Sequence, residues 1–399
     1  MSAAPAAATT PGTAAAGIRC RVLHTYKIYK PEVEGGIPAV ISVLTAMAGP
    51  EIDNEVLTAR RRGWFRRLTD GKTPVIAVSS LGDISSLPVA PSFPFWARAR
   101  AKANDIFVHH VPFPLGDLAI AAFGLPKSTA LIVHWHGDID GRPLLKRLLA
   151  PMFHRALARA DAVVVSDQIM VTNSPFLRRI AAKCVVIPYG IDTAFWRTLD
   201  DTARARVAAL REKYPRLIVA LGRLVPYKGY EVLLRAMARV DNAQLIIIGD
   251  GPLRQDLADL ARDMKIADRV EFAGRLPKDD AKIVVHAASV FVMPSNTIGE
   301  AFGLAQVEAM AAGRPIVNTD LPTTVPKVAR HNLEGLTVPP NDDVGLADAL
   351  QTLLNDRALA ARLGAAGQAR AAAEYDQTTF VRRMENLYAR LAAIRRPSS

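Results

Sequence analysis

The sequence predicts an α/β protein built from two Rossmann-like, doubly wound parallel-sheet domains that face each other across a cleft. Three observations predict this fold. The chain has 399 residues, half of them apolar, which is enough for two ordinary cores. Short β-branched runs alternate with helical stretches, as in parallel sheets covered on both faces. The series of runs then starts afresh after Trp196.

The first series of strands predicts a domain over residues 18–195. Its apolar runs are Cys20–Leu23, Val75–Val78, Ile106–Val108, Leu131–Val133, Ala162–Val165 and Cys184–Ile187. The preceding stretch, residues 1–17, is rich in Ala, Thr and Pro and has neither a basic start nor an apolar segment. We therefore expect a disordered tail there and no secretion signal.

The second series predicts a domain over residues 196–376. Its runs are Leu217–Leu221, Leu245–Ile248, Val270–Phe272, Val290–Met293 and Ile316–Val317. Pro and Gly in the segment 188–192 mark the boundary, before a helical stretch at about 202–213. We expect a last helix, at about 377–394 within the terminal segment 377–399, to return to the first domain.

Charge narrows the class of partner. The formal net charge is +12, and the chain up to Asp192 carries 22 basic against 14 acidic residues. This excess favours an anionic partner, such as a nucleotide-sugar, a lipid diphosphate, an anionic membrane or a nucleic acid. Cys20 and Cys184 lack metal-ligand spacing and are expected to be buried free thiols in a reducing compartment. The sequence has no run of eighteen apolar residues, so we expect no membrane-spanning helix.

The most informative motif follows the run Val290–Met293. Glu300 lies in a loop, Gly303 precedes a helical stretch that contains Glu308, and Gly313 with Pro315 ends that stretch. The amides at such a helix start suit a phosphate, and Gly303 lets the backbone approach a ligand closely. The two carboxylates are expected to reach different parts of one extended ligand.

A second motif is the loop Gly222–Gly229, directly after the first strand of the second domain. Arg223 and Lys228 lie five residues apart in it and can hold a diphosphate from two directions. Their positive charges would stabilise a departing nucleoside diphosphate. The alternative interpretation is a pair of solvated surface cations.

The other candidate residues lie at the ends of further strands. His136 follows the run Leu131–Val133, and Gly35–Gly36 follows the first run. A neutral imidazole can hydrogen-bond a sugar hydroxyl, although a core or interdomain histidine is the alternative. Asp138 and Asp140 alone are a poor metal site, so we expect no metal. The absence of G-x-G-x-x-G after the first strand argues against a nicotinamide or flavin enzyme.

On these motifs the chain resembles the GT-B glycosyltransferases of family 4, the glycogen-synthase-like enzymes with an E-x7-E motif, over about residues 22–340. The resemblance implies that Glu300 holds hydroxyls of the transferred sugar and that Glu308 holds the ribose. It implies a role at the donor sugar for His136. The donor phosphates or base would be bound by Gly35, Gly36, Arg223, Lys228, Leu276, Gly303 and Leu304.

The family also implies the activity. We expect a retaining, metal-independent hexosyltransferase without cofactor, whose nucleotide-sugar is a substrate. The sequence looks closest to bacterial lipopolysaccharide and exopolysaccharide mannosyl- or rhamnosyltransferases, which implies a GDP-sugar donor and a polyprenyl-diphosphate-linked or other saccharide acceptor. A UDP-sugar-dependent glucosyl- or galactosyltransferase is the alternative. An epimerase or phosphorylase of the same fold is a rival enzyme class.

A basic aromatic segment, Arg60–Arg67, mixes five cations with two aromatic residues, and a basic amphipathic helix is predicted over Leu144–Leu157. Such a surface suits shallow docking on anionic lipid, which would place a cytoplasmic protein on the inner face of the cell membrane. A solvated basic face is the alternative. A basic nucleic-acid-binding protein is a further rival, but no zinc spacing, helix-turn-helix or stacking motif supports it, so we expect no nucleic-acid partner.

Overall fold

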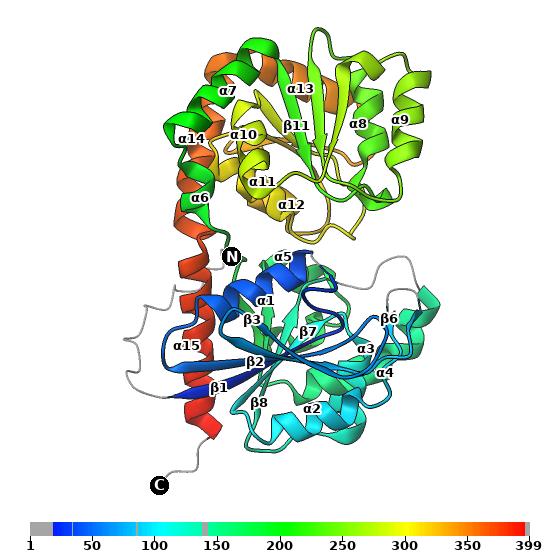
Figure 1. Cartoon of the computed structure of the whole chain (residues 1–399), viewed down its shortest axis with the longest axis vertical. Helices are drawn as coiled ribbons and strands as arrows, with labels where there is room; N and C mark the ends of the chain where they lie inside the picture. Colours follow the sequence, from blue (N-terminus) through cyan, green and yellow to red (C-terminus); the bar gives the residue numbers. More distant parts are fainter. Residues whose placement is uncertain (1–18, 34, 85–86, 138–142, 396–399) are drawn as a thin grey trace, which may run out of the picture.

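A computed structural model describes residues 19–33, 35–84, 87–137 and 143–395. Two α/β domains lie one above the other along the long axis of the molecule (Figure 1). An eight-stranded sheet forms the first domain and a six-stranded sheet forms the second. The predicted fold class, two parallel-sheet α/β domains, is confirmed.

The first sheet has the strand order β10-β9-β8-β7-β1-β2-β4-β3. All its neighbours are parallel except β3 and β4. Its strands are β1 (Cys20–Tyr26), β2 (Ile52–Ala59), β3 (Arg66–Asp70), β4 (Thr73–Val78), β7 (Ile106–Val111), β8 (Ala130–Trp135), β9 (Ala162–Val165) and β10 (Cys184–Val186). Two short strands, β5 (Asp83–Ile84) and β6 (Leu87–Pro88), pair separately.

Helices cover both faces of the first sheet. They are α1 (Gly36–Ala46), α2 (Phe93–Ala101), α3 (Pro114–Leu118), α4 (Pro143–Arg159) and α5 (Gln168–Asn173), with a π-helical turn at Ala119–Phe123 and a 3-10 turn at Arg178–Lys183. Successive residues of a strand point to opposite faces of the sheet and so belong to different cores. Val22 and Val108 pack with α1 and the C-terminal helix, whereas Leu23 and Phe107 pack with α2. This alternation follows from the two-residue period of a strand and explains the continuous apolar runs.

The second sheet is wholly parallel, with the order β13-β12-β11-β14-β15-β16. Its strands are β11 (Leu217–Leu221), β12 (Gln244–Ile248), β13 (Val270–Gly274), β14 (Val290–Met293), β15 (Ile316–Thr319) and β16 (Gly335–Val338). Its helices are α7 (Asp201–Lys213), α8 (Tyr230–Met237), α9 (Arg254–Asp263), α10 (Lys278–Ala287), α11 (Leu304–Ala311), α12 (Val325–Val328), α13 (Asp343–Asn355) and α14 (Arg357–Glu374). The order changes direction at β11 and β14, where open α/β sheets bind their ligands.

The chain passes between the domains twice, and the two passages are bonded together. The amide of Ile191 donates to the carbonyl of Tyr375 at 2.9 Å, and the amide of Gln377 donates to the carbonyl of Ile191 at 2.8 Å. After the first passage comes α6 (Thr193–Arg197), and after the second comes α15 (Gln377–Arg395). Helix α15 packs against β1, β7 and β8 of the first sheet, and Figure 1 shows α14 and α15 as one column along the side of the molecule.

Five strands were not predicted from the sequence pattern: β2, β3, β5, β6 and β16. The polar residues of β2 interrupt its apolar run, and one of them, Glu55, is buried because its Oε1 accepts a hydrogen bond from Arg100 Nε of α2 at 2.8 Å. This contact between distant segments is invisible in local sequence. Cys20 is buried as expected, whereas Cys184 is only half-buried; both are free thiols. The expected tail and the Asp138–Asp140 motif lie outside the described residues.

Candidate functional site

Two loops at the carboxyl ends of β11 and β14 form the candidate site in the second domain. The first contains a 3-10 turn, Pro226–Lys228, and ends at Gly229, whose φ is +68°. A Cβ at Gly229 would lie 2.0 Å from the carbonyl oxygen of Pro294 in the second loop. Only glycine fits both the left-handed backbone and this approach, so the two loops are held against each other.

The second loop ends at Gly303, which precedes α11. Gly303 has a φ of +79°, and a Cβ there would lie 2.5 Å from Met293 Sδ. The residue that precedes α11 therefore has no side chain. This leaves the first amides of the helix accessible to an anion. Leu304, the first residue of α11, is half-buried.

Lys228 and Glu300 meet where these loops touch. Lys228 Nζ lies 2.5 Å from Glu300 Oε2, and Ser295 Oγ donates to the same oxygen at 3.1 Å. Glu300 is buried and Lys228 is half-buried. Burial lowers the pKa of Lys228, but Glu300 and the two neighbouring tyrosines, Tyr230 and Tyr227, outweigh it and raise that pKa above its ordinary value. Lys228 therefore carries a fixed positive charge.

Glu308 lies one to two turns into α11 and is half-buried. Burial raises the pKa of its carboxyl to about 7, and the nearby cations Lys278 and Lys228 oppose that rise. Lys228, Glu300 and Glu308 are named here the lysine–glutamate cluster. The structure thus brings together three of the predicted site residues, and a carboxyl with a pKa near neutrality is typical of a functional site.

The other predicted binding residues surround this cluster or lie in the first domain. Arg223 is exposed on the loop after β11. Burial raises the pKa of Tyr227, and the nearby charges of Lys228 and Arg223 oppose that rise. Leu276, after β13, is half-buried against the core. Gly35 and Gly36 lie at the start of α1, exposed and with open space where a Cβ would be. Their roles stay predictions.

The first domain holds a different polar group, the histidine cluster of His24, His110, His134 and His136. All four side chains are buried. A chain of hydrogen bonds links three of them: His24 Nδ1 to His110 Nε2 at 3.1 Å, and His110 Nδ1 to His136 Nε2 at 2.8 Å. One end of the chain is Asn54 Oδ1, 3.2 Å from His24 Nε2, and the other is Tyr189 Oη, 2.7 Å from His136 Nδ1.

One set of tautomers satisfies this whole chain. If Asn54 Oδ1 accepts from His24, each linked ring carries its proton on Nε2 and accepts on Nδ1, and the Tyr189 hydroxyl donates to His136. The rings are then all neutral. Burial agrees with this, since it lowers the pKa of His24 to about 4 and that of His136 to about 3. Both ring nitrogens of His136 are occupied, so a sugar hydroxyl could reach it only by displacing one partner.

His134 is the exception in the cluster. Among the described residues, neither of its ring nitrogens has a hydrogen-bond partner, although the ring stacks on His136 at 4.3 Å between centroids. His110, His134 and His136 each offer a nitrogen within 4.8 Å of the others. A divalent cation there would break the 2.8 Å bond between His110 and His136, and the group contains no carboxylate to balance buried charge. The donors present suit a hydrogen-bonded cluster better than a metal.

Direct contacts place the histidine cluster next to the second domain. Tyr189 packs edge-on against Phe302, the residue before Gly303, with ring centroids 4.9 Å apart. Ser166 Oγ lies 3.1 Å from Thr324 Oγ1. Sequence analysis missed Tyr189, as well as Ser295 and Lys278 at the other cluster. Tyr189 lies in the Pro-Tyr-Gly segment that marked the domain boundary, which was the signal available for it.

The basic aromatic segment is exposed at the edge of the first sheet. Trp64 is 86% exposed, and Leu81, Ile84 and Phe95 nearby in sequence are 77%, 70% and 62% exposed. Arg66 and Arg67 begin β3, the edge strand. The predicted basic helix is present as α4, where Leu148 is 75% exposed. Among the described helices, none combines the length and the apolar character that crossing a membrane requires.

Both domains match family models of known proteins. The family model "Glycosyl transferase 4-like domain" matches residues 35–190, and "Glycosyl transferases group 1" matches residues 201–370. The chain is 30% identical over 366 residues to the D-rhamnosyltransferase WbpZ of Pseudomonas aeruginosa, covering 88% of this chain and 91% of that protein. It is 29% identical over 377 residues to the O-antigen chain mannosyltransferase C of Escherichia coli, covering 93% and 98%.

Two further likenesses are partial or structural. A GDP-mannose-dependent alpha-(1-6)-phosphatidylinositol monomannoside mannosyltransferase of Mycobacterium tuberculosis is 37% identical over 218 residues, covering 51% of this chain and 55% of that protein. The sucrose-phosphate synthase of Thermosynechococcus elongatus superposes with a TM-score of 0.79 at 22% identity, covering 94% of this chain and 100% of the other. That second likeness shows the fold alone.

Proposed function

Because the chain belongs to the group 1 glycosyl transferases, which makes it a hexosyltransferase of GT-B fold, we propose that it transfers mannose or rhamnose from a GDP-linked donor. The proposed acceptor is a lipid-linked saccharide of a cell-surface polysaccharide. The observation that carries the proposal is the lysine–glutamate cluster, in which a fixed cation and two carboxylates converge at the start of α11.

The donor fits this cluster part by part. The diphosphate would be held by Lys228, by Arg223 and by the amides at Gly303 and Leu304. Glu300 would accept hydrogen bonds from sugar hydroxyls. Glu308 would accept them from the ribose, with Leu276 beside the base. Gly35 and Gly36 would line the phosphates from the first domain, and His136 would lie at the sugar side of the cleft wall.

The proposed reaction retains the configuration at the anomeric carbon and needs no metal. The acceptor hydroxyl attacks from the face of the leaving diphosphate; the bond from the anomeric carbon to the diphosphate breaks as the bond to the acceptor forms. The acceptor proton passes to the departing phosphate oxygen. Lys228 and Arg223 stabilise the charge that develops on that oxygen, which is the work a metal does in other enzymes.

The donor nucleotide is inferred from three relatives whose names give a donor or a transferred sugar. The names of the P. aeruginosa and E. coli relatives assign rhamnosyl and mannosyl transfer, and the M. tuberculosis relative is named as GDP-mannose-dependent. These names favour GDP over UDP, which the sequence left open.

The acceptor side of the proposal uses the exposed basic aromatic segment. Trp64 and Phe95 offer apolar side chains to the headgroup region of a bilayer, and Arg66 and Arg67 offer charge to anionic lipid. A lipid-linked acceptor would then be reached at the membrane surface, which places the enzyme peripherally on the inner face of the cell membrane.

A screen of nucleotide-sugars tests the donor assignment. We expect GDP-mannose or GDP-rhamnose to stabilise the protein by about 2.7 kcal/mol at a hundred times the dissociation constant, and UDP-glucose and UDP-galactose to do so far less. With a polyprenyl-diphosphate-linked saccharide as acceptor, product should still form when EDTA is present. Thermal shift and product analysis measure the two effects.

Matched variants locate the site. Glu308→Ala and Arg223→Ala should abolish the stabilisation, whereas Glu231→Ala, an exposed carboxylate on α8, should keep it. Equal shifts in Glu308→Ala and the parent would reject the assigned site, and a shift by UDP-sugars alone would reject the GDP assignment.

A further inference from the structure

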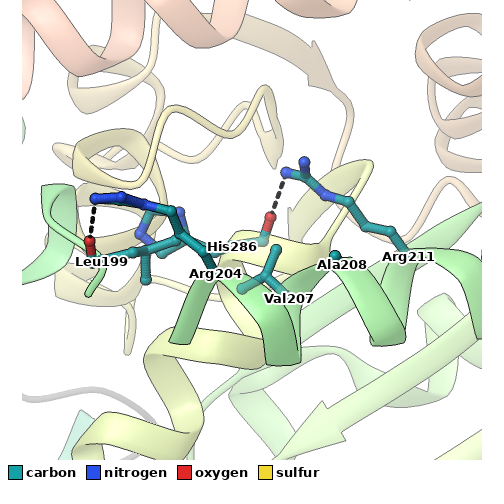
Figure 2. A pocket seen from close by; sticks show the side chains of 6 residues that line it. All are labelled: Leu199, Arg204, Val207, Ala208, Arg211 and His286. Atoms are coloured by element: carbon teal, nitrogen blue, oxygen red, sulfur yellow. Dashed lines mark hydrogen bonds between the residues drawn. The ribbon is translucent and has the colours of Figure 1, made fainter. Parts of the chain in front are cut away.

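A hollow of about 570 Å³ lies in the second domain between α7 and α10, apart from the lysine–glutamate cluster. It is called here the arginine hollow, and its lining residues are Leu199, Arg204, Val207, Ala208, Arg211 and His286. Figure 2 shows Arg204 and Arg211 rising from the same helix toward opposite ends of the hollow, with Val207 between them. Its volume is within the range of small-molecule sites, about 300–1,000 Å³.

Helix geometry explains the arrangement. Positions 204, 207, 208 and 211 follow the i, i+3, i+4, i+7 spacing that places side chains on one helix face. The two arginines are therefore about 10 Å apart along the axis, at a rise of about 1.5 Å per residue. Between them, Val207 and Ala208 form an apolar floor. One face of one helix supplies both the cationic ends and the middle.

Both guanidinium groups are already anchored. Arg204 Nη2 donates to the carbonyl of Leu199 at 2.7 Å, and Arg211 Nη2 donates to the carbonyl of His286 at 2.7 Å (Figure 2). A guanidinium has five N–H donors, so each anchor leaves most of them free. Anchoring also fixes the side chain before a ligand arrives, which lowers the entropy cost of binding.

The charge of the hollow is only partly balanced by neighbouring carboxylates. None of its lining residues is acidic. Arg204 Nη1 lies 3.4 Å from Oδ1 of the exposed Asp201. Asp280 Oδ1 pairs with Arg206 Nη2 at 2.8 Å, and Arg206 does not line the hollow. Within the described residues Arg211 has no ion pair, and the half-buried Arg314 bonds only the carbonyls of Ala288 and Ala312.

The charge of Arg211 also affects the pKa values of its neighbours, although burial has the larger effect. Burial and the charge of Arg211 lower the pKa of Arg314 to about 10. Burial also lowers the pKa of His286 to about 4, with Arg314, Arg211 and Lys282 adding to the effect and a hydrogen bond to the Trp196 carbonyl opposing it. A purely structural role explains one N–H of each arginine, since Arg204 binds the Leu199 carbonyl and Arg211 binds the His286 carbonyl near the end of α10. It does not explain the unpaired charge of Arg211.

We propose that the arginine hollow binds a phosphorylated small molecule at a site separate from the donor site. Its phosphate oxygens would accept hydrogen bonds from Arg211, for which the planar guanidinium is well suited, and a hydroxyl oxygen at the other end of the molecule would accept one from Arg204. Its carbon skeleton would rest on Leu199, Val207 and Ala208. The inference is independent of the proposed function, since no residue of the lysine–glutamate cluster takes part.

Calorimetric titration with mannose 6-phosphate as the probe tests the proposal, with inorganic phosphate as a second titrant. Ala208→Glu places a carboxylate on the floor of the hollow without removing either anchor, and should weaken binding of mannose 6-phosphate at least tenfold. Ala209→Glu, the same charge change on an exposed neighbour outside the lining, should change it less than twofold. Arg211→Gln should weaken binding to a similar degree as Ala208→Glu.

The donor site is excluded by repeating the titration in Lys228→Met, where binding to the hollow should persist within twofold. Loss of binding in Lys228→Met would overturn the proposal by assigning the probe to the donor site. Equal affinities in Ala208→Glu and Ala209→Glu would also overturn it. Equal affinities for inorganic phosphate and mannose 6-phosphate would overturn the assignment of a carbon skeleton to the apolar floor.

Discussion

The two domains end their central strands in polar clusters of opposite character. In the first domain, the histidine cluster is neutral and enclosed, and a single chain of hydrogen bonds from Asn54 to Tyr189 satisfies most of it. In the second, the lysine–glutamate cluster is charged and lies between two glycine-bounded loops. The strand ends of two similar sheets thus carry different chemistry. The charged cluster lies in the second domain, for which donor binding is proposed.

The comparison also extends to protons. Burial lowers the pKa of every histidine in the cluster, whereas it raises the pKa of Glu308. Acid therefore affects the two clusters in opposite directions. The folded first domain resists protonation that its unfolded chain accepts, while the folded second domain holds a proton on Glu308 that its unfolded chain would release.

Acidification should give the largest effect. Between pH 7.5 and 5.5 the unfolded histidines gain protons near their ordinary pKa of about 6.5, whereas the four folded rings stay neutral. The unfolded state then binds more protons, and the free energy of unfolding of the first domain should fall by about 5 kcal/mol. Denaturant titrations followed by tryptophan fluorescence measure this, since Trp64, Trp96 and Trp135 lie in that domain.

A single ring isolates the cause. His134→Phe removes the buried imidazole without hydrogen-bond partners and should reduce the pH dependence by about one proton, with little loss of stability at pH 7.5. An unfolding free energy that is flat from pH 7.5 to 5.5 would mean that the folded cluster accepts protons.

The next effect concerns the end of the histidine chain. Tyr189→Phe removes the hydroxyl 2.7 Å from His136 Nδ1 and leaves that buried nitrogen without a donor, so stability should fall by about 1–3 kcal/mol. The KM for the donor should change less than twofold, because the second domain supplies most of the proposed donor contacts. Denaturant unfolding and steady-state kinetics measure the two quantities.

The kinetic result decides what His136 does. A tenfold change of KM in Tyr189→Phe, in either direction, would show that the freed His136 nitrogen and a sugar hydroxyl interact, and would erase the contrast between an enclosed cluster and a binding cluster. Tyr214→Phe, which removes a hydroxyl from a half-buried ring in the second domain, serves as control and should cost less than about 0.5 kcal/mol.

The smallest effect is on nucleotide affinity. With a pKa of about 7, Glu308 is mostly protonated at pH 6 and mostly ionised at pH 8. The ionised carboxylate accepts two ribose hydroxyls better than the acid, so affinity for GDP should rise about tenfold over this range, or about 1.4 kcal/mol. Calorimetry at the two pH values measures it.

Glu308→Gln separates this effect from the titration of GDP itself. The variant should bind GDP with an affinity that changes far less with pH than the parent's. A parallel pH dependence in both proteins would place the titrating group on the nucleotide and remove Glu308 from the ribose.

Much of the fold was predictable because its strands are continuous and apolar. β7, β8 and β9 are buried along their whole length, so each reads as a strand without reference to any other segment. β2 was not predictable, because the burial of Glu55 depends on Arg100 of α2. β3 was not predictable either, because its residues are mainly polar and exposed. The site motifs were likewise predictable, because a glycine ends the loop after each of two strands, at Gly229 and at Gly303.

The sequence by itself determined the two-domain architecture and the loops that carry Lys228, Glu300 and Glu308, since these depend on local periodicity and on glycine positions. Only the tertiary structure decided that Lys228 and Glu300 touch, that four histidines form one neutral cluster, and that Arg204 and Arg211 flank a hollow. The physical reason is that hydrogen bonds and charges act over a few ångströms in space. Lys228 and Glu300 are 72 residues apart along the chain, and the hollow beside Arg204 and Arg211 is also lined by His286 of a different helix.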